Sequence, residues 1–461
     1  MLPAVLPGRP TAPGRLGALV AVLSVVGALL GQLPAAAAAT PVLYPVPASG
    51  SFAVAGHGSG HGHGLSQYGA QGAGLHGVAL NAILSHYYPG STLGPLPDRP
   101  VRVLLTASVA PADVLVVSPA AGLSVLDEAS WRRILLPSGP ALWRAARARD
   151  GSFRLQSLAP GTTSVWTNQT LLGGVVLAGP LAFSSANAVR LWPAGPTQTD
   201  VRALPSRGYR GQLELRTTSS GGTAVVDQVL MESYLRAVVP LESFSSWPDA
   251  TLQAQAVAAR SYAANKRAAY ATSRYFDVYD STADQSYGGA TAYTATGGAT
   301  AREAASTDRA IAATAGKALM YAGRPAFTQF SASDGGWSAD GGAPYLTASA
   351  DPWERAYSTN PLKDWTGSIS ATRLEDAAGR PHGWLTRLAV TSRDGHGDWG
   401  GRVLLVRLDH VAADGSVSSV ELSGSAVQRA GGLHSTYFTV TSPARGSSTG
   451  ATTGVTVADA G

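Results

Sequence analysis

The sequence contains 461 residues, of which 45% are hydrophobic and 14% are charged. This length is sufficient for two or three domains, and the hydrophobic fraction is sufficient for their cores. The absence of cysteine excludes disulfide bonds, thiol catalysis and the commonest ligands of structural zinc. The net charge of +5 suits an anionic polymer. Since Lys and Arg do not cluster and no aromatic stacking motif is visible, we do not expect nucleic acid as a partner.

The N-terminus has the composition of a secretion signal. Arg9 and Arg15 precede the apolar run 16–30, and the small residues LPAAAAAT follow at 33–40. A positive start, a short apolar core and small residues at a cleavage site predict a signal peptide over residues 1–39. A retained membrane anchor is the alternative, but the run is short for one. No later stretch is long and apolar enough to span a bilayer, so we expect a secreted protein with no stable membrane span after cleavage.

Composition and periodicity divide the chain into segments. They predict a signal peptide (1–39), a linker (40–55), a Gly/His module (56–97), a β-rich region (98–222), a core domain (223–441) and a disordered tail (442–461). The β-rich region consists of short alternating or β-branched runs between Gly, Pro, Ser and Asn. The core domain is expected to be built around a long Ala-rich helix. Together these patterns predict an α+β fold.

The strongest helical pattern in the core domain ends at Tyr270. Ser246 can cap this helix, Pro248 suits its first turn and Asp249 favours its positive end. The residues that follow are mainly Ala, Gln, Lys and Arg, which are good helix formers. Helical periodicity is also present over Gln67–Tyr88. The other predicted elements are a helix at 301–315 and strands at 318–321, 326–332, 385–391, 402–410, 417–422 and 435–440.

Several motifs in the Gly/His module and the core domain are similar to those of one known family. The first motif is GHGSGHGHGLSQYGA with the later ILSHYYPG, and the second is YLRAVVPLESFSSWPDATLQAQAVAARSYA. Further along the chain lie FDVYDSTADQSYGG, ATAGKALMY, QFSASDGGWSADGGAPYLTASADP and GGLHSTYFTV. With this combination the chain resembles the stage II sporulation protein D and amidase-enhancer family over residues 56–93 and 225–440.

Two features depart from the pattern of that family. The Gly/His block lies near the C-terminus of the sporulation protein but near the N-terminus here, and we expect it to fold against the same core. The family's Cys-containing loop carries Tyr279 and Ala283 in this chain in place of metal ligands. We therefore carry over no zinc site, and we expect neither a metal nor another cofactor.

The resemblance implies a lytic transglycosylase of the bacterial cell wall that cleaves peptidoglycan glycan strands. The catalytic glutamate of the family falls on Glu242. Glycosidic cleavage needs a carboxylic acid that protonates the leaving oxygen. A hydrolase usually carries two carboxylates, whereas a lytic enzyme can use one. A structural interpretation of Glu242 is also open, either as a helix-end carboxylate or as the partner of Arg260.

Two other classes of function are consistent with the sequence. The family name implies a non-catalytic wall-binding protein that enhances an N-acetylmuramoyl-L-alanine amidase, which would then be a protein partner. A purely structural wall protein is the third class. The residue that separates these classes is Glu242, because an enzyme requires its transferable proton and a binding protein tolerates glutamine there.

Residues within the family motifs are candidates for contact with the glycan. The set is Arg260, Tyr287, Ser331, Ser333, Gly335, Gly336, His61, His63 and Gln67. An arginine in an Ala-rich helix needs a partner, so Arg260 is expected to meet Glu242, Asp277 or substrate. Gly335 and Gly336 leave room for backbone N–H groups to approach a sugar oxygen. The tyrosine of this set offers a stacking face, or it belongs to the core.

Three histidines, His57, His61 and His63, lie at closely spaced positions in the Gly-rich loop. Three histidines can hold a catalytic zinc ion. Because no acidic or fourth ligand is nearby in the sequence, we expect no metal here. The loop is expected to border the substrate cleft.

Overall fold

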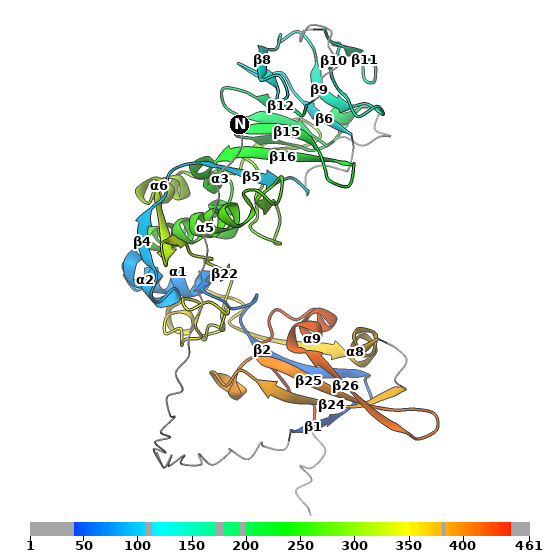
Figure 1. Cartoon of the computed structure of the whole chain (residues 1–461). Coiled ribbons are helices and arrows are strands. Elements are labelled where there is room, and N and C mark those ends of the chain that lie inside the picture. The colour runs from blue at the N-terminus through cyan, green and yellow to red at the C-terminus, as the bar shows by residue number, and fades with distance from the viewer. Residues whose placement is uncertain (1–40, 107–112, 171–178, 194–199, 380–382, 444–461) are drawn as a thin grey trace, which may run out of the picture. The chain divides into compact units, whose positions relative to one another are not determined.

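A computed structural model describes residues 41–106, 113–170, 179–193, 200–379 and 383–443 (Figure 1). The predicted signal peptide and the predicted tail from residue 444 onward lie outside these ranges. The described residues form helices and several sheets, which confirms the α+β fold. Within this part of the chain no helix combines the length and the apolar character needed to cross a bilayer.

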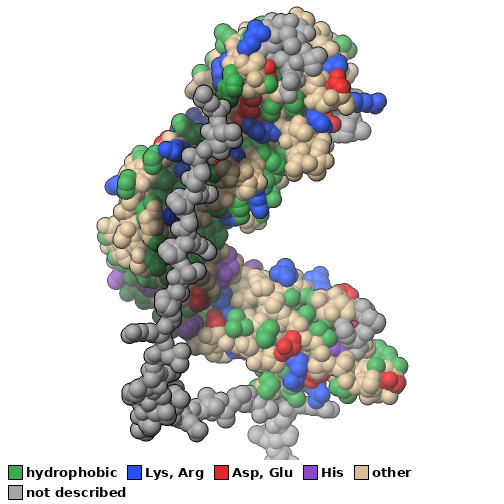
Figure 2. All heavy atoms as spheres, in the orientation of Figure 1, with side chains coloured by type: hydrophobic (Ala, Val, Ile, Leu, Met, Phe, Trp, Pro, Cys, Tyr) green, Lys and Arg blue, Asp and Glu red, His purple; other side chains and the backbone are tan. Residues whose placement is uncertain are grey.

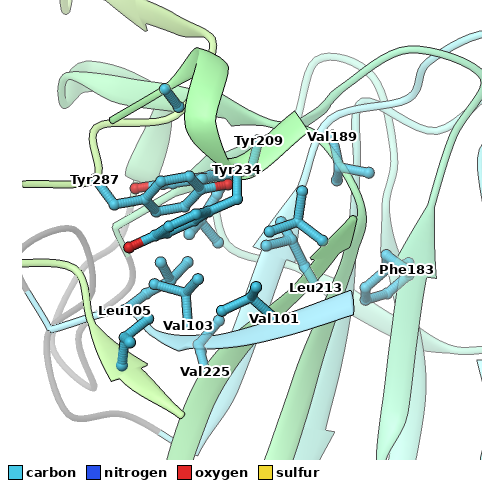
Figure 3. Close-up of a cluster of buried hydrophobic side chains, with 14 of the residues drawn as sticks. Val101, Val103, Leu105, Phe183, Val189, Tyr209, Leu213, Val225, Tyr234 and Tyr287 are labelled. Carbon is cyan, nitrogen blue, oxygen red and sulfur yellow. The ribbon is translucent and has the colours of Figure 1, made fainter. Parts of the chain in front are cut away.

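Two sheets form most of the β-rich region and share one hydrophobic core. The larger sheet contains, in spatial order, β11 (Trp166–Asn168), β10 (Phe153–Leu158), β9 (Leu142–Arg147), β6 (Val114–Val117), β13 (Val189–Trp192), β14 (Ser206–Tyr209), β18 (Thr291–Tyr293) and β19 (Ala299–Ala301). The second contains β17 (Val278–Tyr279), β5 (Pro100–Leu104), β16 (Thr223–Leu230), β15 (Gln212–Thr217), β12 (Leu181–Ser184), β7 (Ser124–Asp127) and β8 (Arg132–Leu135). Val101 and Val103 alternate inward from β5, as a half-buried strand requires (Figure 3).

The shared core crosses the predicted boundary at residue 222. Strands β16 to β19 belong in sequence to the predicted core domain, yet each pairs within one of these two sheets. The same hydrophobic cluster includes Leu213 of β15, Val238 and Ala256. The β-rich region and the core domain are therefore one packed structure at this point.

The helix α5 (Asp249–Tyr270) packs on both sides. Its Ala256, Ala259 and Ala263 join the core of the β sheets, whereas Ala254 and Val257 join a second core. Small side chains on both faces allow neighbouring backbones to approach closely. The neighbouring helices are α1 (Gln67–Leu75), α2 (Leu80–Tyr87), α3 (Met231–Arg236), α4 (Val239–Glu242) and α6 (Ala305–Ala313). Near the start of α5, Pro248 is the N-cap residue and makes no side-chain cap, so the predicted cap by Ser246 is not formed.

The Gly/His segment is built into the core rather than forming a module of its own. Its strands pair with strands distant in sequence: β3 (Leu65–Ser66) with β22 (Phe330–Ser331), β4 (Thr92–Pro95) with β20 (Lys317–Tyr321), and β2 (Ser51–His57) with both β23 (Asp364–Ser370) and β27 (Phe438–Val440). The predicted linker contains β1 (Leu43–Pro45) and most of β2. The helix expected over Gln67–Tyr88 is interrupted at Gly77, whose φ of +79° lies in the left-handed region.

The C-terminal part adds a four-stranded sheet with its own core. The sheet has the order β1, β24 (Trp384–Arg393), β25 (Val403–Val411) and β26 (Val417–Ser423), and α8 (Ala371–Ala378) and α9 (Gly424–Gly431) lie beside it. Phe52 and Val54 of β2 pack with Leu388 and Val406 of this sheet. The remaining elements are η1 (Val201–Ala203), β21 (Arg324–Pro325), α7 (Glu354–Tyr357) and η2 (Asp398–Gly400).

Candidate functional site

Glu242 is the last residue of the short helix α4. Its Oε1 accepts a hydrogen bond of 2.6 Å from the backbone N–H of Ser286, and its side chain is partly exposed. Among the described residues, Oε2 has no hydrogen-bond partner. Leu241 and Phe244 are exposed on either side of Glu242 in sequence, and Trp247 packs behind Phe244. The carboxyl group is thus held by one oxygen and open to a ligand at the other.

The N–H group that holds Glu242 is fixed by its neighbours in sequence. Gln285 is buried, where it accepts a 2.9 Å hydrogen bond from the Tyr234 hydroxyl and donates to the carbonyl of Ala259. On the other side, Tyr287 donates a 2.6 Å hydrogen bond to Asp227. Because both neighbours are anchored in the core, the position of Ser286 is determined. A backbone donor leaves no side-chain signal, so the sequence could not reveal this contact.

Tyr287 does not offer a stacking face to solvent. Its ring lies 5.2 Å from that of Tyr234 and 5.8 Å from that of Tyr209, within the core of the β sheets (Figure 3). Burial, followed by the nearby Asp227 carboxylate, raises the pKa of Tyr287 well above its usual value. Of the two interpretations of this tyrosine, the structure places it in the core.

Arg260 is fully buried and paired with Glu232. Its guanidinium also donates to Thr314 and to the carbonyl of Lys317. Of the partners expected for it, Glu242 and Asp277 are not contacted, and Glu232 takes their place. The side chain has no exposed surface with which to meet a ligand, and its contacts are those of a structural residue.

Gln67, the first residue of α1, contacts α5. Its Nε2 is 3.4 Å from Oε1 of Gln255. Gln255 is one helical turn before Ala259, whose carbonyl accepts from Gln285. Gln67 is itself buried. The structure therefore shows Gln67 as a buried residue that joins α1 to α5, one helical turn from the residue that holds Gln285.

The two Gly-rich motifs contact each other directly. Ser59 and Ser333 exchange backbone hydrogen bonds of 3.0 Å, and the N–H of Gly62 donates to the hydroxyl of Ser331. Gly335 has a φ of +77°, and a Cβ there would lie 2.7 Å from the Cβ of His57. A larger residue would separate the motifs. The structure thus brings the Gly/His block against the SASDGG segment, as the sequence predicted for the block and the core.

His61 and His63 lie side by side beside this contact, with ring centroids 4.6 Å apart. Part of the His61 ring is exposed, but desolvation by the surrounding protein, His63 and Arg402 lower its pKa to about 4. The pKa of His63 is also lowered, mainly by burial. Histidines visible on one face of the molecule gather near α1 and α2 (Figure 2). Since both rings are neutral at pH 7, they add polar atoms but no charge to this surface.

Glu354 is the centre of a buried hydrogen-bond network that the sequence did not reveal. The carboxylate is fully buried and accepts from five donors. They are the hydroxyls of Ser66 and Ser333, the backbone N–H groups of Asp334 and Gly335, and the amide of Asn360. Gly335 N–H, which was expected to approach a sugar, is used here. Gly336 N–H donates 2.8 Å to the Asp334 side chain.

Glu354, Asp334 and Asp351 form the group of acidic residues whose oxygens lie within 4.8 Å of one another, close enough to share a metal ion. A metal ion needs free lone pairs on its ligands. The five donors around Glu354 occupy the lone pairs of that carboxylate, since a carboxylate has about four acceptor sites. The network therefore fits a structural role better than metal binding.

Part of the chain is similar in sequence to known proteins. Residues 219–321 match the family described as Stage II sporulation protein. A 168-residue region is 32% identical to an uncharacterised protein of Brachyspira hyodysenteriae (strain ATCC 49526 / WA1), covering 33% of this chain and 43% of that protein. A 168-residue region is 30% identical to the amidase enhancer of Bacillus subtilis (strain 168), covering 34% of this chain and 20% of that protein. The chain thus matches less than half the length of each relative.

Proposed function

Since residues 219–321 match the Stage II sporulation protein family, we propose that this chain cleaves peptidoglycan glycan strands as a lytic transglycosylase, with Glu242 as the catalytic residue. The family and the amidase-enhancer relative support a role in the cell wall. Secretion through the predicted signal peptide belongs to the same proposal. The observation that carries the assignment is the Glu242 carboxyl group, held at Oε1 by Ser286 and open at Oε2.

The proposed reaction uses one carboxyl group twice. Protonated Glu242 gives its proton to the glycosidic oxygen as the bond from C1 of muramic acid to that oxygen breaks. The carboxylate then takes the proton of the muramic acid 6-hydroxyl, whose oxygen bonds to C1. The proton returns to Glu242, and no water is consumed. The nucleophile is already part of the substrate, which lowers the entropic cost of the attack.

A residue predicted to contact glycan stays in the proposal only if its side chain is exposed to solvent. His61 is exposed and His63 is partly exposed, so both remain candidates for polar contact with the strand. Ser331, Ser333, Gly335 and Gly336 are engaged in the contact between the two Gly-rich motifs and in the Glu354 network. We propose that these four residues lie beneath the proposed glycan-contacting surface and fix its shape through their hydrogen bonds.

The test is Glu242→Gln, assayed by mass spectrometry of products from purified glycan strands. The amide oxygen can still accept from Ser286, so folding is expected to be unchanged while product release is lost. Asp249→Asn is the matched control, because Asp249 is exposed at the start of α5 and makes no side-chain hydrogen bond in the structure. Product release by Glu242→Gln at the parent rate would show that Glu242 is not the acid.

Enhancement of a wall amidase is the second candidate function, and the amidase-enhancer relative favours it. A non-catalytic enhancer does not need the proton of Glu242. Glu242→Gln would then stimulate stem-peptide release by an N-acetylmuramoyl-L-alanine amidase as well as the parent does. Loss of stimulation together with loss of glycan cleavage would favour the enzyme.

A further inference from the structure

The segment 394–401, which joins β24 to β25, holds a tryptophan in a strained conformation. Trp399 has φ 58° and ψ 15°, in the left-handed region that bulky side chains rarely adopt. Three hydrogen bonds to two side chains hold the segment in place. Asp394 accepts from the N–H groups of His396 and Arg402, and the Tyr437 hydroxyl accepts from the N–H of Asp398 at 2.6 Å. Backbone strain that the surroundings enforce is characteristic of functional positions.

The strained backbone places the Trp399 indole flat on a buried histidine. The ring of His57 lies 4.3 Å from the indole at an interplanar angle of 3°, and Tyr437 meets the indole edge-on. Trp399 is nevertheless 40% exposed. Because His57 covers one face, the exposed area belongs to the opposite face and the edges. The result is a rigid aromatic surface open to solvent.

Two exposed carboxylates lie within ion-pair distance of the histidine beneath the indole. Asp364 Oδ1 lies 2.8 Å from Nδ1 of His57, and Asp398 Oδ2 lies 3.2 Å from Nε2. Their side chains are 52% and 61% exposed. Nε2 of His57 has no hydrogen-bond partner among the described residues, so Asp398 is near the imidazole without being bonded to it. Both carboxylates are more than half exposed and can therefore meet a ligand. Arg355 approaches Asp364 at 3.1 Å and adds hydrogen-bond donors.

An open aromatic face with exposed carboxylates near the ring beneath it can receive a pyranose ring. The C–H face of the sugar packs on the indole, and the hydroxyl groups donate to the carboxylates. We propose that Trp399, Asp364 and Asp398 form a carbohydrate-binding site that shares no residue with the Glu242 contacts. Asp364 and Asp398 outnumber Arg355, the cation that approaches Asp364, so the site disfavours an anionic sugar. The ligand is therefore a neutral hexopyranose, and the N-acetylglucosamine unit is the neutral unit of the glycan if the proposed function holds.

The experiment is calorimetric titration of the full chain with chitotetraose, a neutral oligomer of N-acetylglucosamine that has no muramic acid to react. We expect Trp399→Ala to weaken binding about tenfold, the size of a lost aromatic contact. Asp364→Asn combined with Asp398→Asn is expected to weaken it as well, and these exposed, isosteric changes preserve folding. Trp384→Ala, at a tryptophan 66% exposed on β24, is the control and should bind as the parent does.

Chitotetraose bound equally well by Trp399→Ala or by the double aspartate variant would overturn the site, as would no binding by the parent. This titration requires no turnover, so its outcome is separate from that of the cleavage assay. A parent that binds through Trp399 but releases no product would remove the catalytic role of Glu242 and leave the carbohydrate site standing.

Discussion

Arg260 and Glu232 form a bidentate ion pair, with Nε 2.9 Å from Oε1 and Nη2 2.6 Å from Oε2. The pair joins α5 to α3, and the further donation to Thr314 ties both to the end of α6. A buried arginine without its counter-charge is costly because the charge stays in a low-dielectric environment. This explains why an Ala-rich helix carries an arginine at its centre.

Glu232→Gln should therefore destabilise the protein by about 3 kcal/mol in denaturant unfolding, because it leaves Arg260 charged and buried. Asp200→Asn is the control, since the Asp200–Arg202 pair is about one-third exposed on both sides and is expected to contribute at most about 1 kcal/mol. Equal effects of the two substitutions would show that burial of Arg260 does not determine the strength of its pair.

The shifted pKa of Asp334 leads us to expect that the stability of the protein depends on pH. Burial, followed by Asp351 and Glu354, raises the pKa of Asp334 well above its usual value. In the unfolded chain its pKa is about 3.9, so only the unfolded state loses this proton as the pH rises above about 4. The contribution of Asp334 to stability is then present at low pH and is lost as pH rises, by at most about 1.4 kcal/mol per unit.

Asp334→Asn removes this titration while keeping the shape of the protonated acid. Relative to the parent, the variant should gain stability as the pH is raised from about 4 to about 7, measured by urea unfolding. Asp340→Asn, at an exposed aspartate of the same segment, is the matched surface substitution to measure beside it. A constant difference between Asp334→Asn and the parent across this range would contradict the raised pKa.

The left-handed backbone of Trp399 predicts an unusual order of stabilities. Both Trp399→Ala and Trp399→Gly remove the indole, but only glycine adopts positive φ without strain. The glycine variant should be more stable than the alanine variant by about 1 kcal/mol, measured by thermal unfolding. At Trp384 in strand β24 the order should reverse, because glycine weakens a strand. The same order at both positions would argue against strain at Trp399.

Much of the fold could be predicted from local patterns. The run of good helix formers after Pro248 predicted α5, which ends at Tyr270 as expected. Patterns within one segment do not reveal its partners, however. The strand β3 is two residues long and pairs with β22 at residues 330–331, so no periodicity could identify it. The same limitation made the Gly/His segment look like a separate module.

The residues of the candidate site also fall into those that the sequence could identify and those that it could not. Glu242 could be identified because its motif surrounds it in sequence, and the structure gives it a partly exposed carboxyl group. The polar groups of the Gly-rich motifs could not be assigned, because their partners are distant. Ser66 caps α1 and donates to Glu354, 288 residues away. Whether a backbone N–H group points to a ligand or to a buried carboxylate depends on the tertiary fold alone.

Product chemistry separates the proposed lytic reaction from hydrolysis, because a hydrolase usually needs a second carboxylate. The sequence offers Asp277, Asp280 and Asp334 as distant sources of one. In the structure these side chains belong to residues that are 1%, 4% and 0% exposed. Asp277 pairs with Arg102, and Asp280 accepts from the hydroxyl of Thr106. None of the three has an exposed carboxylate with which to activate water beside a bound strand.

We therefore expect muramic acid ends to be released as 1,6-anhydro sugars, one water lighter than hydrolytic ends. Digestion of purified glycan strands in water labelled with heavy oxygen provides the measurement, since internal attack by the 6-hydroxyl incorporates no label and hydrolysis places one labelled oxygen at each new reducing end. A hydrolytic muramidase run in parallel supplies the labelled reference. Labelled reducing ends as the main product would contradict the single-carboxylate reaction, and they would require a movement that exposes one of the buried aspartates.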